Sequence, residues 1–291
     1  MSNFLRLIFN SLQTGSIFAL AALGIVLIFR TSRTTNFAQG LIGTFNAYVA
    51  ATVMVRLGFN IWISTLVAMI TAFIMGIIID TIIIRPAAKV SPISKQIITL
   101  GIIMVIIGII PYFFGVDSMY LPNFIPTGSF NIFGAALRYN TLFVISVSLV
   151  LMGLMFWFIQ YTKWGLATRV TASNETTSKL MGVPTNNVTM VSWAVAAILG
   201  TLAAIFVAPN VSVQTNMLLN VQVSAFFAGT LGGFSTFLGP VVAAYIIAFA
   251  RNFTAFYISD IWGNVIVYMS ILVFLYFKPY GLLGKKPIKK V

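Results

Sequence analysis

Four acidic side chains are the only carboxylates in this chain of 291 residues, and they limit the chemistry that it can perform. Their spacing in the sequence is not that of a catalytic pair or of metal ligands; the four residues are Asp80, Asp117, Glu175 and Asp260. The chain also has no cysteine and no histidine, which removes thiol chemistry, imidazole acid–base catalysis and the usual zinc ligands. We therefore expect no catalytic residues, no metal site and no cofactor, and a hydrolase or metalloenzyme is disfavoured.

The longest polar segment spans residues 165–187, GLATRVTASNETTSKLMGVPTNN, and is called the polar island below. Glu175 and Lys179 stand four residues apart, in the order that stabilises a helix. No glycine or proline interrupts residues 166–181, whereas Gly182 is a typical helix terminator. The island is therefore predicted to form one or two short helices.

An apolar minority within the polar island leaves two interpretations open. A short amphipathic helix with exposed apolar side chains can dock into the groove of a partner protein. The same helix can instead lie on lipid headgroups. The apolar side chains are Leu166, Val170, Leu180, Met181 and Val183.

The elements that position the polar island are apolar and long. Hydrophobic residues make up 59% of the chain, mean hydropathy is +1.02, and only 7% of residues are charged, against about 25% in soluble domains. Runs of roughly 20 apolar residues, long enough to cross a bilayer, follow one another without the alternation of barrel strands. The fold class is therefore all-α, a polytopic membrane protein with about eight or nine spanning helices. Because the basic residues lie mostly between apolar runs, the net charge of +13 indicates membrane orientation and not nucleic-acid binding.

Loops rich in lysine and arginine predict the sidedness, because such short loops stay in the cytoplasm. The loop 85–95, the polar island and the tail 278–291 are predicted to be cytoplasmic, and the poorly charged segments 117–139 and 209–220 external. These assignments give nine crossings and place the N-terminus outside. The count requires the weakly apolar run 221–236 to cross the membrane, unless two other runs are re-entrant. The predicted spans are 8–29, 36–55, 61–84, 96–116, 141–160, 190–208, 221–236, 238–256 and 262–277.

Two stretches depart from the pattern of simple membrane anchors. In TLGGFSTFLGP, glycine and proline permit either a tight turn between helices or a broken helix beside a transport path. In NFAQGLIGTFNAYVA, polar side chains either link helices or line a cavity, and three of the residues share one helix face by their spacing. The candidate breaks are Gly232, Gly233, Gly239 and Pro240, and the candidate pathway residues are Asn36, Gln39, Gly43 and Asn46.

No stretch of the chain has the spacing of a nucleotide-binding P-loop. GLLGKKP near the C-terminus lacks the required spacing and the hydroxyl residue, and it follows an apolar span instead of a strand. If ATP drives transport, the ATPase must therefore be a separate subunit.

Five stretches, in order along the chain, resemble the ABC importer permeases of the branched-chain amino-acid class. The stretches are GSIFALAALGIVLIFRTSRTTNFAQG, IIIRPAAKVSPISKQIITLGI, TKWGLATRVTASNETTSKLMGVPTNNV, AFFAGTLGGFSTFLGPVVAAYIIA and FKPYGLLGKK. The resemblance covers nearly the whole chain and implies one permease domain, residues 1–291, with a cytoplasmic coupling loop at about 162–189. In that family the loop docks on the ATPase, which implies as contact residues Arg169, Ser173, Glu175, Lys179, Leu180, Met181 and Gly182.

The resemblance also implies partners and a location. The expected partners are two cytoplasmic ATPases, a second permease subunit, either identical or different, and an extracytoplasmic solute-binding protein. The expected location of the permease is a bacterial inner membrane. The chain departs from the family pattern at three places. Gln39 stands where the family commonly has histidine, and Arg251 takes a position that is often acidic. A glycine–serine pair is replaced by Phe234, Ser235 and Thr236. Branched-chain amino acids are the expected solute, with a sugar, nucleoside, urea or amide importer or an ion-coupled secondary transporter as alternatives.

Overall fold

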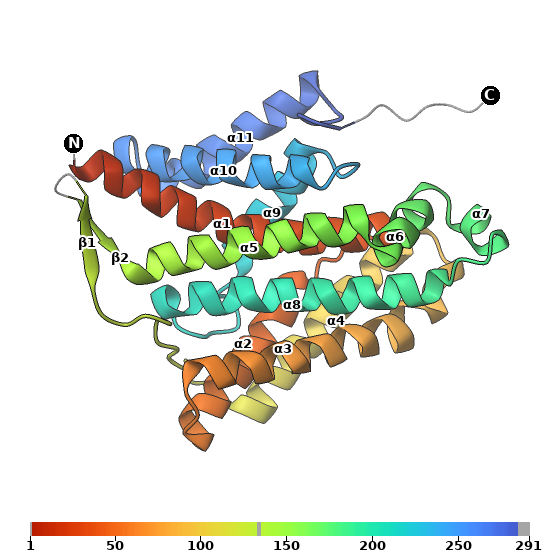
Figure 1. The fold of residues 1–291 in the computed structure, drawn as a ribbon, viewed down its shortest axis with the longest axis horizontal. Helices are drawn as coiled ribbons and strands as arrows, with labels where there is room; N and C mark the ends of the chain where they lie inside the picture. Colours follow the sequence, from red (N-terminus) through yellow and green to blue (C-terminus); the bar gives the residue numbers. More distant parts are fainter. Residues whose placement is uncertain (1, 133–134, 285–291) are drawn as a thin grey trace.

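The computed structural model describes residues 2–132 and 135–284, most of which form a bundle of long helices (Figure 1). Among these residues, eight helices are long and apolar enough to cross a membrane. Even α11, with 18 residues, is about 27 Å long at ~1.5 Å per residue. The eight are α1 (Ser2–Ser32), α2 (Gln39–Leu57), α3 (Ile61–Ile78) with its π-helical extension η1 (Ile79–Ile84), α4 (Pro92–Phe114), α5 (Tyr139–Tyr161), α8 (Thr185–Val211), α10 (Leu238–Tyr257) and α11 (Asp260–Phe277).

Shorter elements connect and cap the bundle. Strands β1 (Ser129–Ile132) and β2 (Ala135–Arg138) form an antiparallel hairpin before α5, an element that the sequence pattern does not predict. The hairpin lies beside the start of α1, and α6 and α7 lie at the opposite end (Figure 1). We call these the hairpin end and the α7 end. The remaining short elements are η2 (Pro86–Lys89), α6 (Lys163–Ser173), α7 (Glu175–Leu180) and α9 (Leu219–Gly232).

The centre of the bundle is formed by α1 and α8, which pack against each other and are the most buried of the spanning helices. Small residues allow this close packing. A side chain at Gly43 of α2, for example, would lie 2.5 Å from the carbonyl oxygen of Gly200 in α8. By contrast, α4, α5 and α11 are mostly exposed although apolar, which is expected of faces that contact lipid.

The weak run predicted at 221–236 is not a full span. Its helix, α9, has 14 residues and is only about 21 Å long. The preceding irregular segment 212–218 is partly inside the protein, because Val213, Met217 and Leu218 are buried whereas Gln214 and Asn216 are exposed. Together they return the chain from the hairpin end, where α8 finishes, to the α7 end, where α10 starts (Figure 1). Irregular backbone is tolerated at membrane depth when protein surrounds it, so the expected nine passes comprise eight long helices and one half-span.

The glycine-rich stretch forms a tight turn between α9 and α10. α9 ends at Gly232, and Gly233 has a φ of +90°, which favours glycine. An added side-chain carbon on Gly232 would lie 2.1 Å from the carbonyl carbon of Gly239, so the two helices meet backbone to backbone. Pro240 lies in the first turn of α10, where proline is tolerated. Of the predicted basic tail, residues 285–291 lie outside the described residues.

Candidate docking surface and translocation cavity

The polar island folds into α6 and α7, which form the α7 end of the molecule (Figure 1). Each helix has a side-chain cap: the Thr162 hydroxyl accepts a hydrogen bond from the amide of Gly165, and the Asn174 carboxamide accepts one from that of Thr177, both at 3.0 Å. Gly182, with a φ of +80°, follows α7. The predicted short helices are therefore present.

The outer surface of the polar island carries apolar side chains that the described residues leave exposed. Leu180, the last residue of α7, is 84% exposed, and Met181, which follows it, is 74% exposed. Glu175 and Lys179 of the same helix form an exposed ion pair of 2.6 Å. Ser173 and Gly182 are also exposed. Such an apolar patch framed by charges is typical of a protein–protein contact site.

Arg169 differs from the other residues of the proposed coupling set. Its guanidinium turns back toward α5, where it donates hydrogen bonds to the Gln160 carbonyl at 3.3 Å and side-chain oxygen at 3.5 Å. Arg169 therefore contacts the bundle, whereas Leu180 and Met181 point away from it.

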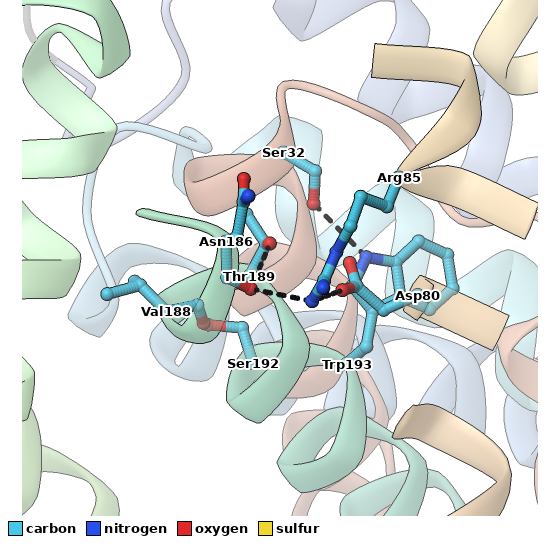
Figure 2. Close-up of polar contacts among 8 residues, drawn as sticks. All are labelled: Ser32, Asp80, Arg85, Asn186, Val188, Thr189, Ser192 and Trp193. Carbon is cyan, nitrogen blue, oxygen red and sulfur yellow. Dashed lines mark hydrogen bonds and ion pairs between the residues drawn. The ribbon is translucent and has the colours of Figure 1, made fainter. Parts of the chain in front are cut away.

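The start of α8, which follows the polar island, is bound to the end of α3 by a polar cluster (Figure 2). Asp80, in the π-helical extension η1, is 1% exposed and lies 3.3 Å from the Arg85 guanidinium. The same Arg85 nitrogen donates to the Asn186 carbonyl at 3.3 Å. The π-helical turn of η1 brings together side chains that are five positions apart, and the near-complete burial of Asp80 accompanies the packing of η1 against α8.

A second bond of this cluster joins α8 to α1. The Trp193 indole, 1% exposed, donates to the Ser32 hydroxyl at 3.2 Å (Figure 2). Arg33, just after α1, donates to the carbonyl of Ala172 in α6. Side-chain hydrogen bonds therefore join α6, α8, α3 and α1 at the α7 end.

The predicted pathway residues lie in helix contacts within this chain. Asn36 donates to the Gln39 side chain at 3.0 Å, and Gln39 donates to the Ala196 carbonyl of α8 at 2.6 Å. Asn46 accepts from the hydroxyl of Thr71 in α3 at 2.8 Å. Gln39, Gly43 and Asn46 hold α2 to its neighbours, whereas Asn36 bonds Gln39 and the Ala38 amide beside it. The role of all four residues in a pathway stays a prediction.

The adjacent face of α2 lines a cavity of about 390 Å³ between α2, α4 and α9. Its wall is mostly apolar, from Leu41, Ile103 and Phe226 among others. Its polar lining residues are Thr44, Thr215, Asn216 and Gln222. The Gln222 side chain bonds the backbone at Phe37 and Gly40, and the Thr44 hydroxyl is buried without a hydrogen-bond partner among the described residues. An apolar cavity with few polar groups suits a small, largely aliphatic solute.

A larger cavity of about 840 Å³ opens at the hairpin end between α1, α5 and the end of α10. Amide and hydroxyl side chains form its floor, including Gln13 and Thr141, which are 2.9 Å apart, and Asn140, 2.9 Å from Asn123. The sequence hint of this cavity is the polar pair Gln13–Thr14 within an apolar run, but its other walls come from distant segments.

Among the described residues, eight helices able to span a membrane and a polar cavity at one end of the bundle are typical of a multi-pass membrane permease subunit. Residues 7–275 match the family model described as branched-chain amino acid transport system / permease component, and the chain belongs to this family. It is 24% identical to the high-affinity branched-chain amino acid transport system permease protein BraD of Pseudomonas aeruginosa, over 99% of this chain and 98% of that protein.

Two further similarities agree with this family. The chain is 26% identical to the probable branched-chain amino acid transport permease protein LivH of Methanocaldococcus jannaschii, over 92% of this chain and 89% of the relative. Among solved structures, PsaBC from Streptococcus pneumoniae in complex with Fab aligns with a TM-score of 0.50 and 14% sequence identity. The alignment covers 92% of this chain and 90% of that chain, and at this identity it supports the fold alone.

Proposed function

We propose that this permease imports branched-chain amino acids through the plasma membrane of a bacterium, driven by two separate cytoplasmic ATPase subunits. The observation that carries the proposal is the exposure of Leu180 and Met181 on the polar island, where an ATPase groove can receive them. The charge distribution supports a cytoplasmic α7 end, because lysine and arginine concentrate in its loops. These basic residues include Arg33, Arg85, Lys95, Lys163, Lys179 and Lys278.

The proposed cycle uses the connections at the α7 end. ATP binding closes the two ATPases and moves the polar islands of this chain and of a second permease subunit. Through the Asp80–Arg85 pair and the bond from Arg33 to the Ala172 carbonyl, that movement shifts α3, α8 and α1 together. Rigid, packed helices favour two discrete arrangements over a continuous deformation, which suits alternating access.

The solute path is proposed to use both cavities. An external solute-binding protein delivers the amino acid at the hairpin end, where the polar cavity includes Asn123 and Asn210 from the segments predicted to be external. The aliphatic side chain of the solute then fits the apolar cavity between α2, α4 and α9, with Thr44 and Gln222 as polar contacts. A sugar or nucleoside, which carries many hydroxyl groups, fits this apolar wall less well.

Affinity purification and reconstituted transport test the proposal. The tagged permease should copurify with an ATPase that hydrolyses ATP, and vesicles holding the complex and its binding protein should accumulate radiolabelled isoleucine. Accumulation should stop when ATP is removed and persist when ion gradients are collapsed. Uptake that needs an ion gradient without ATP would instead identify a secondary transporter, and competition by ribose or urea but not leucine would reassign the solute.

A further inference from the structure

A cavity of about 560 Å³ at the α7 end is not used by the proposed transport path. It lies between the ends of α1 and α5, helix α6 and the turn that precedes α10. Its wall combines guanidinium groups with aromatic rings, and the main contributors are Arg30, Phe156, Trp157, Gln160, Arg169 and Phe237.

The positive charge at this cavity has no carboxylate to balance it. Arg33 and Arg169 are both close enough to Arg30 for their charges to repel. All four acidic residues of the chain are elsewhere: Asp80 pairs with Arg85 and Glu175 pairs with Lys179, while Asp117 follows α4 and Asp260 begins α11 at the hairpin end. Two arginines line the cavity, Arg30 and Arg169, with Arg33 nearby and no acidic side chain among the lining residues, and such a site favours an anion.

The partners of these arginines leave donors free. Arg30 lies over the Phe237 ring, 4.4 Å from its centre, and Arg33 donates to a backbone carbonyl. The Nε of Arg169 is buried and has no hydrogen-bond partner among the described residues. A buried donor of a charged group is costly when unpaired, and guanidinium groups pair readily with phosphate oxygens.

The cavity opens toward the face of the bundle that contacts lipid. Trp157 at its rim is 58% exposed, and the exposed apolar face of α5 continues from it through Leu154 and Val150. On α10, Leu238 and Val242 are likewise exposed. α1 packs against both α5 and α10 (Figure 1); residues 15–28 of α1 are buried, and Arg30 in its last turn is half-buried.

We propose that this cavity binds the phosphate group of an anionic phospholipid, such as phosphatidylglycerol, from the cytoplasmic leaflet. Arg30 and Arg169 hold the phosphate oxygens with their planar donor groups, which suit phosphate geometry better than lysine does. The acyl chains lie along the exposed apolar faces of α5 and α10, and Trp157 lies at the level of the headgroups, as interfacial tryptophans do. Basic pockets between helices on the cytoplasmic side are known to hold acidic headgroups in other membrane proteins.

Retention of lipid by the intact purified protein tests this proposal. The protein is extracted from membranes containing equal phosphatidylglycerol and phosphatidylcholine, and bound lipids are counted by native mass spectrometry. Wild type should retain phosphatidylglycerol preferentially, and Arg30→Gln and Arg169→Gln should each reduce that retention about fivefold, the usual contribution of one cation near an anionic surface. Arg6→Gln and Arg138→Gln, at the hairpin end, are the matched controls and should retain it fully.

Three checks keep the test decisive. Each variant must elute as a monodisperse peak, and Arg30→Lys, which keeps the charge, should lose less lipid than Arg30→Gln. Adding millimolar inorganic phosphate should leave retention unchanged if the lipid is the ligand; phosphate binding without enrichment of phosphatidylglycerol would overturn the lipid source. Equal retention of lipid in all variants would overturn the site itself. The site would also be overturned if Arg169→Gln released a copurifying ATPase without loss of lipid.

Discussion

One nitrogen of Arg85 lies 3.3 Å from the Asp80 carboxylate and also donates to the Asn186 carbonyl, so a single guanidinium joins the end of α3 to the start of α8. The two partners differ in burial: the Asp80 side chain is 1% exposed and that of Arg85 34%. This asymmetry predicts that the two residues respond differently to substitution, because only Asp80 would be left as a buried charge.

Arg85→Met should destabilise the protein by about 3 kcal/mol, the low end for breaking a buried ion pair from one side. Asp80→Ala should cost less, about 1 kcal/mol, because Arg85 can turn toward solvent. The double variant should be more stable than Arg85→Met alone. Thermal unfolding in detergent measures all three, with Asp117→Ala, an exposed carboxylate, as the control. Equal and additive losses would show that the pair does not act as a unit.

The contact between Gly232 and Gly239 predicts a large effect from one methyl group. Gly232→Ala should lower stability by about 1–3 kcal/mol, as overpacking does, because the new carbon would lie 2.1 Å from the Gly239 carbonyl carbon. Gly108→Ala in α4, where nothing lies within 4 Å, should be neutral or slightly stabilising. Fluorescence-monitored unfolding compares the two, and a tolerant Gly232→Ala would mean that α9 and α10 can separate freely.

The docking surface predicts loss of coupling without loss of folding. Met181→Asp or Leu180→Asp should reduce ATP-driven uptake at least tenfold, since placing a charge against an apolar groove costs more than about 1.4 kcal/mol. Membrane insertion should be normal. Val116→Asp, at a site 86% exposed at the hairpin end, is the control and should transport normally. Full uptake by Met181→Asp, with the ATPase still bound, would remove that residue from the docking surface.

The cavity between α2, α4 and α9 predicts a role for Thr44. Thr44→Val keeps the side-chain shape and removes a hydroxyl that has no partner among the described residues, so stability should be unchanged or slightly higher. If the hydroxyl contacts the solute, the import rate should fall about fivefold to tenfold, the value of one hydrogen bond. Thr201→Val, whose hydroxyl donates to the Ala197 carbonyl within α8, is the control. Unchanged import would place the path outside this cavity.

The existence and order of the spanning helices follow from the sequence, because a stretch of about 20 apolar residues is stable in lipid only as a helix. The end of the polar helical segment follows as well, because Gly182 terminates it. Asp80 and Arg85 are only five positions apart, so their pairing needs no distant segment. In each case the physical cause acts over a few residues, so the pattern alone determines the result.

Only the tertiary structure decides which face of each helix meets which neighbour. Gln39 and Asn46 share a face by their spacing, but that face packs on α8 and α3, whereas Thr44, on an adjacent face, reaches the cavity. The half-span α9 and the arginine cavity depend in the same way on segments far apart in the chain. Helical periodicity fixes the relative directions of side chains on one helix, and the close packing of small residues between non-adjacent helices fixes what those side chains contact.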